Sequence, residues 1–401
     1  MKVLQGIRIV EQGTFITGPC AAMLLSDLGA DVIKVESPGN GDPYRSFRNG
    51  NYSAHFQAYN RNKRSISLDM KSEADRAIFR DLIGSADAYI QNFRPGAAHR
   101  MGADPEALRA INERLVYCSI SGFGQTGPYS KRPSYDSVTQ ALSGFLGVAV
   151  DPNNPRLLGP ALADAITGYY AAMGILAALV ERGRSGTGRL IEISMLEAMM
   201  HFAIEPFTGY FALGDVPTAL DRPKLAQAFL VRCRDGKFIA IHMSSVDKFW
   251  ENLVAAIDGQ VLISDSRFAV RQGRIDNYDA LLTELNEIFG KADRPTWVAR
   301  LEQFDVPFGP INSISEAAED PQARHLEMIV PVSQRSEGAL EAIRPAFSFD
   351  GVHAASVKAA PRIDEDGAFI RQALAANPAA WPAPSIQQPM KPAPRSPEKV
   401  E

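Results

Sequence analysis

The sequence predicts an α/β protein in which a Rossmann-like, doubly wound parallel sheet forms a large domain beside a smaller α+β domain. Three observations support this fold class. Short apolar runs alternate with amphipathic segments through the first half, a nearly uncharged helical run covers residues 168–180, and a hairpin signal appears only after about residue 205. Strands that alternate with helices are typical of parallel sheets covered by helices.

In the first half, apolar runs predict strands at residues 7–10, 32–35, 65–68, 88–91, 116–119 and 190–193. Helical periodicity predicts helices between them, at residues 19–28, 72–83, 105–112, 136–145 and 165–182. Pro19 suits a first helical turn, where the missing N–H of proline is not needed, and Ser72 suits an N-cap.

In the second half, Asp235-Gly236 separates the apolar runs 229–234 and 237–242, which predicts a β-hairpin. Amphipathic patterns predict helices at residues 246–257, 276–289, 295–303 and 364–376. The expected division is a large domain at 1–195, a linker at 196–224, a small α+β domain at 225–313, a return linker at 314–345, a C-terminal part at 346–376 that completes the large domain, and a disordered, Pro-rich tail at 377–401.

The 401 residues carry a net charge of −4 without a globally basic face, which argues against nucleic-acid binding. Cys20, Cys118 and Cys233 are too far apart for metal-ligand spacing and suit a reducing compartment. The N-terminus lacks a signal-peptide core, and the run 168–180 is too short to cross a bilayer. We therefore expect a cytoplasmic protein with no metal, no tightly bound cofactor and no membrane partner.

The turn after the first strand, residues 11–19, lacks the Gly-x-Gly-x-x-Gly fingerprint of a dinucleotide site and is instead a generic site for anions or amides. Glycine and basic residues gather at four places where strands of such a sheet end, the edge at which open α/β sheets bind ligands: 39–45, 60–64, 92–96 and 99–102. For any single one of these four segments, its glycine and basic residues are explained either by phosphate binding or by the needs of a solvent-exposed turn. The same two explanations apply to the glycine-rich loop 121–129.

Asp164 stands just before the nearly uncharged run 168–180. It is either a capping acid stabilised by the helix dipole or a nucleophilic carboxylate in a dry cleft. This segment alone favours the cap, because capping acids are common and nucleophilic ones are rare.

Together these segments resemble the class III CoA-transferase family, which includes formyl-CoA transferase, carnitine CoA-transferase and alpha-methylacyl-CoA racemase. The matching segments keep the family's order: 29–36, 41–42, 92–96, 121–124, 163–168, 186–188, 235–238, 306–312 and 320–322. The resemblance implies a homodimer of two interlocked, ring-like protomers, with the linkers closing each ring and the active site at the dimer interface.

The resemblance also assigns Asp164 as the nucleophile that attacks an acyl-CoA thioester, with coenzyme A passing to a carboxylic acid through an aspartyl anhydride and an aspartyl-CoA thioester. Succinyl-CoA is a candidate donor by analogy. Each tetrahedral intermediate needs N–H donors, which the loops around Gly13 and Gly122–Gly124 are placed to supply.

The family pattern places the substrate pocket at Tyr135, Asp136, Gly122 and Gly124. It places contacts to coenzyme A at Phe15, Ile16, Thr17, Leu68, Lys71, Asn92, Phe93, Arg100 and Met101. Ser37 stands where formyl-CoA transferase has an arginine near the adenine, so either Arg45 takes that place or the contact is missing.

The nearest alternative is racemisation at the alpha carbon of an acyl-CoA. Family racemases pair the aspartate with a histidine, whereas this stretch reads Ser134-Tyr135-Asp136, and tyrosine is a poorer base near neutral pH. His55 or His99 would have to replace that histidine in space. A CoA-binding scaffold without turnover is a further alternative, which an intact Asp164 disfavours. We predict a CoA-transferase.

Overall fold

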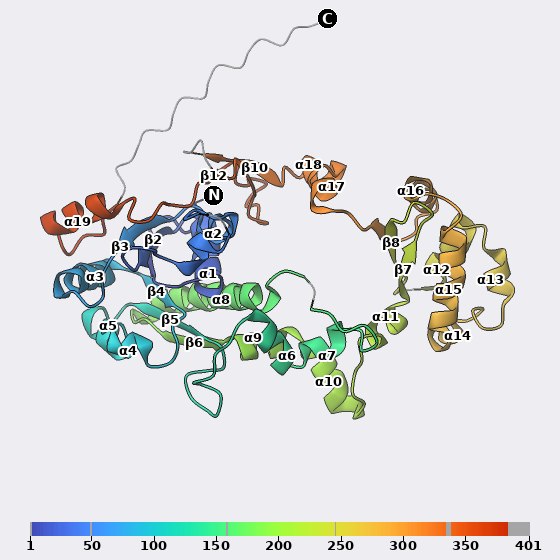
Figure 1. The fold of residues 1–401 in the computed structure, drawn as a ribbon, viewed down its shortest axis with the longest axis horizontal. Coiled ribbons are helices and arrows are strands. Elements are labelled where there is room, and N and C mark those ends of the chain that lie inside the picture. The colour runs from blue at the N-terminus through green and yellow to red at the C-terminus, as the bar shows by residue number, and fades with distance from the viewer. Residues whose placement is uncertain (1, 49, 158, 245, 334–337, 384–401) are drawn as a thin grey trace, which may run out of the picture. The chain divides into compact units, whose positions relative to one another are not determined.

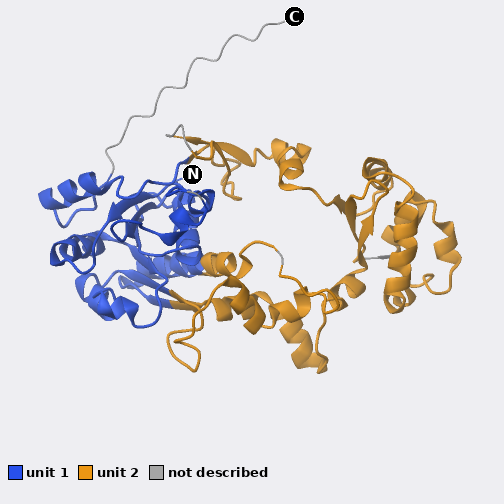
Figure 2. Cartoon of the chain, in the orientation of Figure 1, with its two compact units in different colours: residues 1–119, 171–191, 358–401 blue, residues 120–170, 192–357 orange. Residues whose placement is uncertain are grey.

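The computed structural model describes residues 2–48, 50–157, 159–244, 246–333 and 338–383. The chain divides into two compact units, which Figure 2 distinguishes by colour. Unit 1 contains residues 1–119, 171–191 and 358–401, and unit 2 contains residues 120–170 and 192–357. The domain boundaries expected from the sequence stay a prediction.

The central sheet has the order β3-β2-β1-β4-β5-β6. Figure 1 labels β2 to β6 of this sheet. Its strands are β1 (Arg8–Glu11), β2 (Asp31–Glu36), β3 (Arg64–Ser67), β4 (Ala88–Gln91), β5 (Val116–Ser121) and β6 (Leu190–Ser194). The β1–β2, β2–β3, β1–β4 and β4–β5 pairs are parallel, with Ile9 opposite both Val32 and Ala88. This order confirms the predicted α/β class, and it places the carboxyl ends of β1 and β4 side by side at the switch point where such sheets bind ligands.

Helices cover the sheet of unit 1, whose strands β1, β2, β4 and β5 are almost entirely buried. The helices are α1 (Thr17–Asp27), α2 (Ala54–Asn60), α3 (Glu73–Ser85), α4 (Ala97–Arg100), α5 (Pro105–Ile111), α19 (Gly367–Ala376) and the short 3-10 helix η1 (Pro43–Ser46). Because the chain runs outward from β1 to β3 and then returns to β4, right-handed crossovers place α1 and α3 on opposite faces. Ser72 caps α3 as predicted, accepting a hydrogen bond from the Asp75 amide.

The C-terminal part of unit 1 packs beyond Asn377, where the sequence predicted a tail to begin. Trp381 Nε1 donates a hydrogen bond to Asp31 Oδ2 at 2.7 Å, and the Pro382 carbonyl accepts one from Arg64. The rest of the predicted tail, residues 384–401, lies outside the described residues.

Helix α8 (Leu162–Ser185) is longer than the predicted 165–182. By length and composition alone it could cross a membrane, and no other helix in the described part of the chain passes that test. Core helices of soluble proteins pass it too, and here Ala171 and Ile175 are fully buried.

The first helices of unit 2 are α6 (Asp136–Leu142), where the sequence predicted a helix at residues 136–145, and α7 (Phe145–Ala149), which it did not predict. Gly144, with a φ of +82°, separates them. The predicted linker 196–224 is largely helical, with α9 (Met195–Phe202), α10 (Ile204–Leu213) and α11 (Asp221–Ala226).

The predicted hairpin is confirmed in unit 2 as β7 (Ala228–Arg232) and β8 (Phe238–His242), which β9 (Phe308–Pro310) extends into an antiparallel sheet. Its core is shared with α12 (Val246–Ala256), α13 (Gln260–Ser264), α15 (Tyr278–Phe289) and α16 (Arg294–Gln303), and α14 (Arg271–Asp276) precedes α15. The unit ends with α17 (Ile314–Ala318), α18 (Pro321–His325) and the short strands β10 (Ile329–Ser333), β11 (Glu341–Ile343) and β12 (Val357–Lys358).

Candidate active site

Asp164 lies in the first turn of α8 and is partly buried. The cap of that helix is a different carboxylate: Asp136 Oδ1 accepts hydrogen bonds from the Ala163 amide at 2.7 Å and from the Asp164 amide at 3.3 Å. Gln140 holds the other oxygen of Asp136 at 2.6 Å. Because Asp136 satisfies the orphan amides of the helix start, the side chain of Asp164 is not needed as a cap.

The surroundings of Asp164 disfavour its charged form. Burial raises its pKa, and the nearby charge of Asp136 raises it further, to about 7. Among the described residues, no side chain donates a hydrogen bond to the Asp164 carboxylate. Such a poorly solvated carboxylate is a better nucleophile than one held by several donors, and near neutral pH a large fraction of it is ionised.

Gly122 connects the loop after β5 to the segment that leads into Asp136. A Cβ at this position would lie 2.3 Å from Ser134 Cβ, so only glycine fits without movement. Ser134 in turn hydrogen-bonds Thr139 of α6 at 2.8 Å. Unit 2 therefore brings together Gly122, Tyr135, Asp136 and Asp164 as one connected group, in which Tyr135 is exposed.

Gly124, also predicted to line the pocket, has a φ of +94°. Its amide donates to Ser121 Oγ at 2.9 Å. That amide is already committed within the loop, which leaves the amides of Gly122 and Phe123 as the candidates for stabilising a tetrahedral oxyanion.

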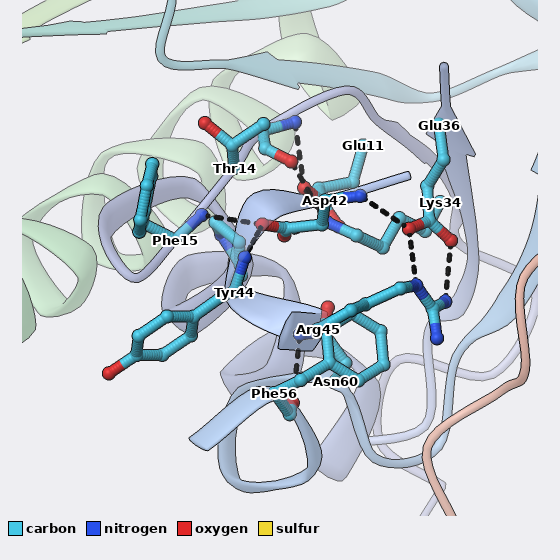
Figure 3. Close-up of polar contacts among 12 residues, drawn as sticks. Glu11, Thr14, Phe15, Lys34, Glu36, Asp42, Tyr44, Arg45, Phe56 and Asn60 are labelled. Carbon is cyan, nitrogen blue, oxygen red and sulfur yellow. Dashed lines mark hydrogen bonds and ion pairs between the residues drawn. The ribbon is translucent and has the colours of Figure 1, made fainter. Parts of the chain in front are cut away.

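In unit 1, the turn between β1 and α1 carries the predicted CoA contacts Phe15 and Ile16, and Thr17 is the first residue of α1. Figure 3 shows Phe15 in this turn. Its amides are already used by side chains. The Gly13 amide donates to Glu11 Oε1 at 2.7 Å, the Thr14 amide to Asn92 Oδ1 at 2.9 Å, and the Phe15 amide to Asp42 Oδ1 at 3.0 Å. The expectation that amides around Gly13 stabilise an oxyanion is therefore not supported.

Asn92 joins the carboxyl end of β4 to this turn. Its Nδ2 donates to the Thr14 carbonyl and to Thr17 Oγ1, both at 2.8 Å. The structure thus brings Asn92 together with Phe15, Ile16 and Thr17 at the switch point of the sheet, while the side chain of Asn92 serves to fix the turn.

Arg45 does not reach outward toward a ligand. It is buried, pairs with both carboxylate oxygens of Glu36 at 2.7 and 2.6 Å, and donates its remaining nitrogen to the Pro361 carbonyl at 3.1 Å. Its guanidinium also lies 3.8 Å from the centre of the Phe56 ring. We therefore correct the suggestion that Arg45 replaces the arginine missing at Ser37, because its nitrogens already have partners inside the protein.

The other predicted CoA contacts are spread over unit 1. Leu68 is fully buried in the core, and Met101 packs against the same cluster. Lys71 and Arg100 are exposed, and the Phe93 amide is held by Gln91 Oε1 at 2.7 Å. Of these, the exposed cations are the groups available to a phosphate.

Sequence reasoning missed a buried ionic cluster under the turn, with Lys34 at its centre. Lys34 Nζ contacts Glu11 at 3.1 Å, Asp42 at 3.0 Å and the Gly13 carbonyl at 2.8 Å. Burial alone would lower the pKa of Lys34, but the surrounding carboxylates outweigh it and raise the pKa. The available signal was Lys34 and Glu36, which alternate with apolar residues in the strand Asp31–Glu36.

The sequence matches CoA-transferase family III over residues 4–367, and the chain belongs to this family. Similar proteins include acetyl-CoA:oxalate CoA-transferase from Acetobacter aceti, 34% identical over 379 residues (92% of this chain, 95% of the relative), and succinate–glutarate CoA-transferase from Agrobacterium fabrum, 32% identical over 383 residues (92% and 94%). The crystal structure of a CaiB/BaiF family protein from Brucella suis aligns with a TM-score of 0.84 at 33% identity, covering 92% of this chain and 99% of that one. The chain is thus a CoA-transferase, as the sequence predicted.

Proposed function

We propose that this enzyme moves coenzyme A from an acyl-CoA to a carboxylic acid, with Asp164 as the nucleophile. The observation that carries the proposal is that the two carboxylates at the start of α8 differ in their contacts. Asp136 caps the helix, whereas the partly buried carboxylate of Asp164 accepts no hydrogen bond from a described side chain.

The reaction proceeds in four balanced steps. The Asp164 carboxylate attacks the thioester carbonyl of the donor, forming an aspartyl-acyl anhydride and releasing CoA thiolate. The thiolate attacks the aspartyl carbonyl, giving an aspartyl-CoA thioester and the free donor acid. The acceptor carboxylate attacks this thioester and expels the thiolate again, which then attacks the acyl carbonyl of the new anhydride, forming acceptor-CoA and restoring Asp164.

The names of the relatives support a short dicarboxylic acid as one of the two acids, since oxalate, succinate and glutarate all appear in them. We extend this to the present chain as a proposal, with succinyl-CoA as the donor. Those names also favour transfer over racemisation. For coenzyme A we propose the turn 15–17 together with Asn92 and Phe93, and the exposed Lys71 and Arg100 for its phosphates.

We also propose that the enzyme works as a homodimer whose protomers interlock. Helix α10 supports this, because it has no buried residue yet is strongly apolar, with Phe211 and Leu213 about three-quarters exposed. An apolar surface of this kind is typical of a subunit interface. Buried free thiols at Cys20, Cys118 and Cys233 are consistent with a reducing compartment, and we propose the cytoplasm.

The test is to trap the acyl-enzyme. The full chain is incubated with acetyl-, succinyl- and glutaryl-CoA, quenched with hydroxylamine and analysed by peptide mass spectrometry. We expect a hydroxamate on the peptide that contains Asp164, and none in Asp164→Asn. Solvent deuterium entering the alpha position of a 2-methylacyl-CoA, without any adduct, would instead establish racemisation.

A further inference from the structure

Six charged side chains lie buried together behind the turn formed by residues 13–17. They are three carboxylates and three cations: Glu11, Glu36, Asp42, Lys34, Lys63 and Arg45, all at most 5% exposed. Their formal charges balance. Ion pairs link Lys63, Glu11, Lys34 and Asp42 in a chain, and Arg45 pairs separately with Glu36, which accepts a hydrogen bond from the Asp42 amide. Buried ionic clusters add little stability over apolar packing of the same volume. We therefore ask which backbone segments this cluster holds in place.

Asp42 connects this cluster to the backbone of Phe15, which lies 27 residues earlier in the sequence. Its Oδ1 accepts hydrogen bonds from the Phe15 amide at 3.0 Å and from the Tyr44 amide at 2.9 Å. Its Oδ2 lies 3.0 Å from Lys34 Nζ, as an ion pair without the alignment of a hydrogen bond. The Asp42 amide is itself fixed by Glu36 Oε1 at 3.0 Å. Asp42 is therefore immobilised from both sides.

Phe15 has a backbone conformation that an aromatic residue rarely adopts, with a φ of +59°. Such a conformation costs on the order of 1–3 kcal/mol and persists only where the surroundings enforce it, which happens most often at functional sites. Figure 3 shows the Phe15 amide facing Asp42 while the Phe15 ring points away from the cluster, on the same side as the Tyr44 ring. The two ring centres are 5.7 Å apart.

We propose that Asp42 is a positioning residue which, backed by Lys34, holds Phe15 in its left-handed conformation and so sets the turn 13–17 before acyl-CoA binds. This rests on the proposed function, in which residues 15–17 contact coenzyme A. Asp42 is 1% exposed, so it acts through the turn and not by direct contact with a ligand. Because the turn is already ordered in the free enzyme, binding of acyl-CoA does not have to offset the entropic cost of ordering it.

The variant that tests this is Asp42→Asn, compared with Asp87→Asn. Asp87 is a matched control, because it is a buried aspartate of the same unit that pairs with Arg8 at 2.8 Å and Arg182 at 3.0 Å but does not contact the turn. We expect Asp42→Asn to weaken CoA binding and to raise KM for acyl-CoA by about tenfold, with kcat within about threefold of wild type. Asp87→Asn should lower thermal stability while leaving CoA affinity unchanged. Wild-type affinity in Asp42→Asn, or an equal loss in both variants, would overturn the proposal.

A measurement on the wild-type protein covers the case in which Asp42→Asn fails to fold. Hydrogen exchange of peptides spanning residues 12–17 should be slow in the free enzyme and change little when coenzyme A is added. Fast exchange that slows only with coenzyme A would overturn the proposal, because the turn would then be ordered by the ligand. If wild type bound no coenzyme A, the proposed CoA contacts would fail, whereas slow exchange in the free protein would still support the fixed turn.

Discussion

The Asp136 carboxylate accepts a hydrogen bond from the Asp164 amide at 3.3 Å. Burial is the larger cause of the raised pKa of the Asp164 side chain, and the charge of Asp136 is the second cause. The two carboxylates thus differ in their surroundings. Asp136 accepts three hydrogen bonds from described groups, and Asp164 accepts none from a described side chain. Neighbouring carboxylates whose environments differ in this way commonly take different roles in a reaction.

The first prediction concerns the pH dependence of acylation. Because Asp164 must be ionised to attack and its pKa is about 7, kcat/KM for the acyl-CoA should fall as the pH drops below about 7. Asp136→Asn keeps an oxygen for the helix cap but removes the neighbouring charge, so the acid limb should move to lower pH. The exposed Asp151 gives a control, Asp151→Asn, that should leave the profile in place. An acid limb unaffected by Asp136→Asn would contradict this account.

The second prediction concerns stability. The pKa of Asp164 rises on folding from 3.8 to about 7, so between these values the folded protein binds more protons than the unfolded chain. The stability contributed by the protonated group is complete below pH 3.8 and is lost as the pH rises to about 7. Asp164→Asn should therefore raise Tm over wild type more at pH 8 than at pH 5, by about 1 °C for each kcal/mol that the substitution adds to the free energy of unfolding. The same increment at both pH values would contradict the raised pKa.

The third prediction concerns Gly122. Gly122→Ala places a methyl group 2.3 Å from Ser134 Cβ, which should displace the segment leading to Asp136 and lower kcat/KM by about tenfold or more. The double variant Gly122→Ala with Ser134→Gly removes the clash and should recover much of the loss. Gly84→Ala in α3, where the nearest atom would be 3.9 Å away, serves as a control for substituting alanine. Failure of the double variant to recover activity would show that the close approach is not the cause.

The sequence predicted the sheet strands to within one or two residues, because buried parallel strands are short apolar runs between turn signals, as at Ala88–Gln91. It could not show that Asp136 caps a helix that begins 26 residues later, since that contact depends on tertiary folding. The sequence also could not show that Arg45 is buried and not a surface cation. Its contacts with Glu36 and Phe56 depend on tertiary folding and leave no signal in the neighbouring residues. The sequence did not predict α7, because a helix of five residues is too short to show a helical period.

The fourth prediction concerns the apolar helix α10. Phe211 is 77% exposed in the single chain, so a charge there costs the isolated protomer little. If a second copy covers this helix, Phe211→Asp would bury a charge at the interface and weaken association by about tenfold or more. Val261→Asp in α13 is the control, because Val261 is 78% exposed and also lies in unit 2. Light scattering coupled to size-exclusion chromatography should show dissociation and parallel loss of activity for Phe211→Asp alone. A Phe211→Asp protein that stayed dimeric and active would mean that α10 is covered by something other than a second copy, or by nothing.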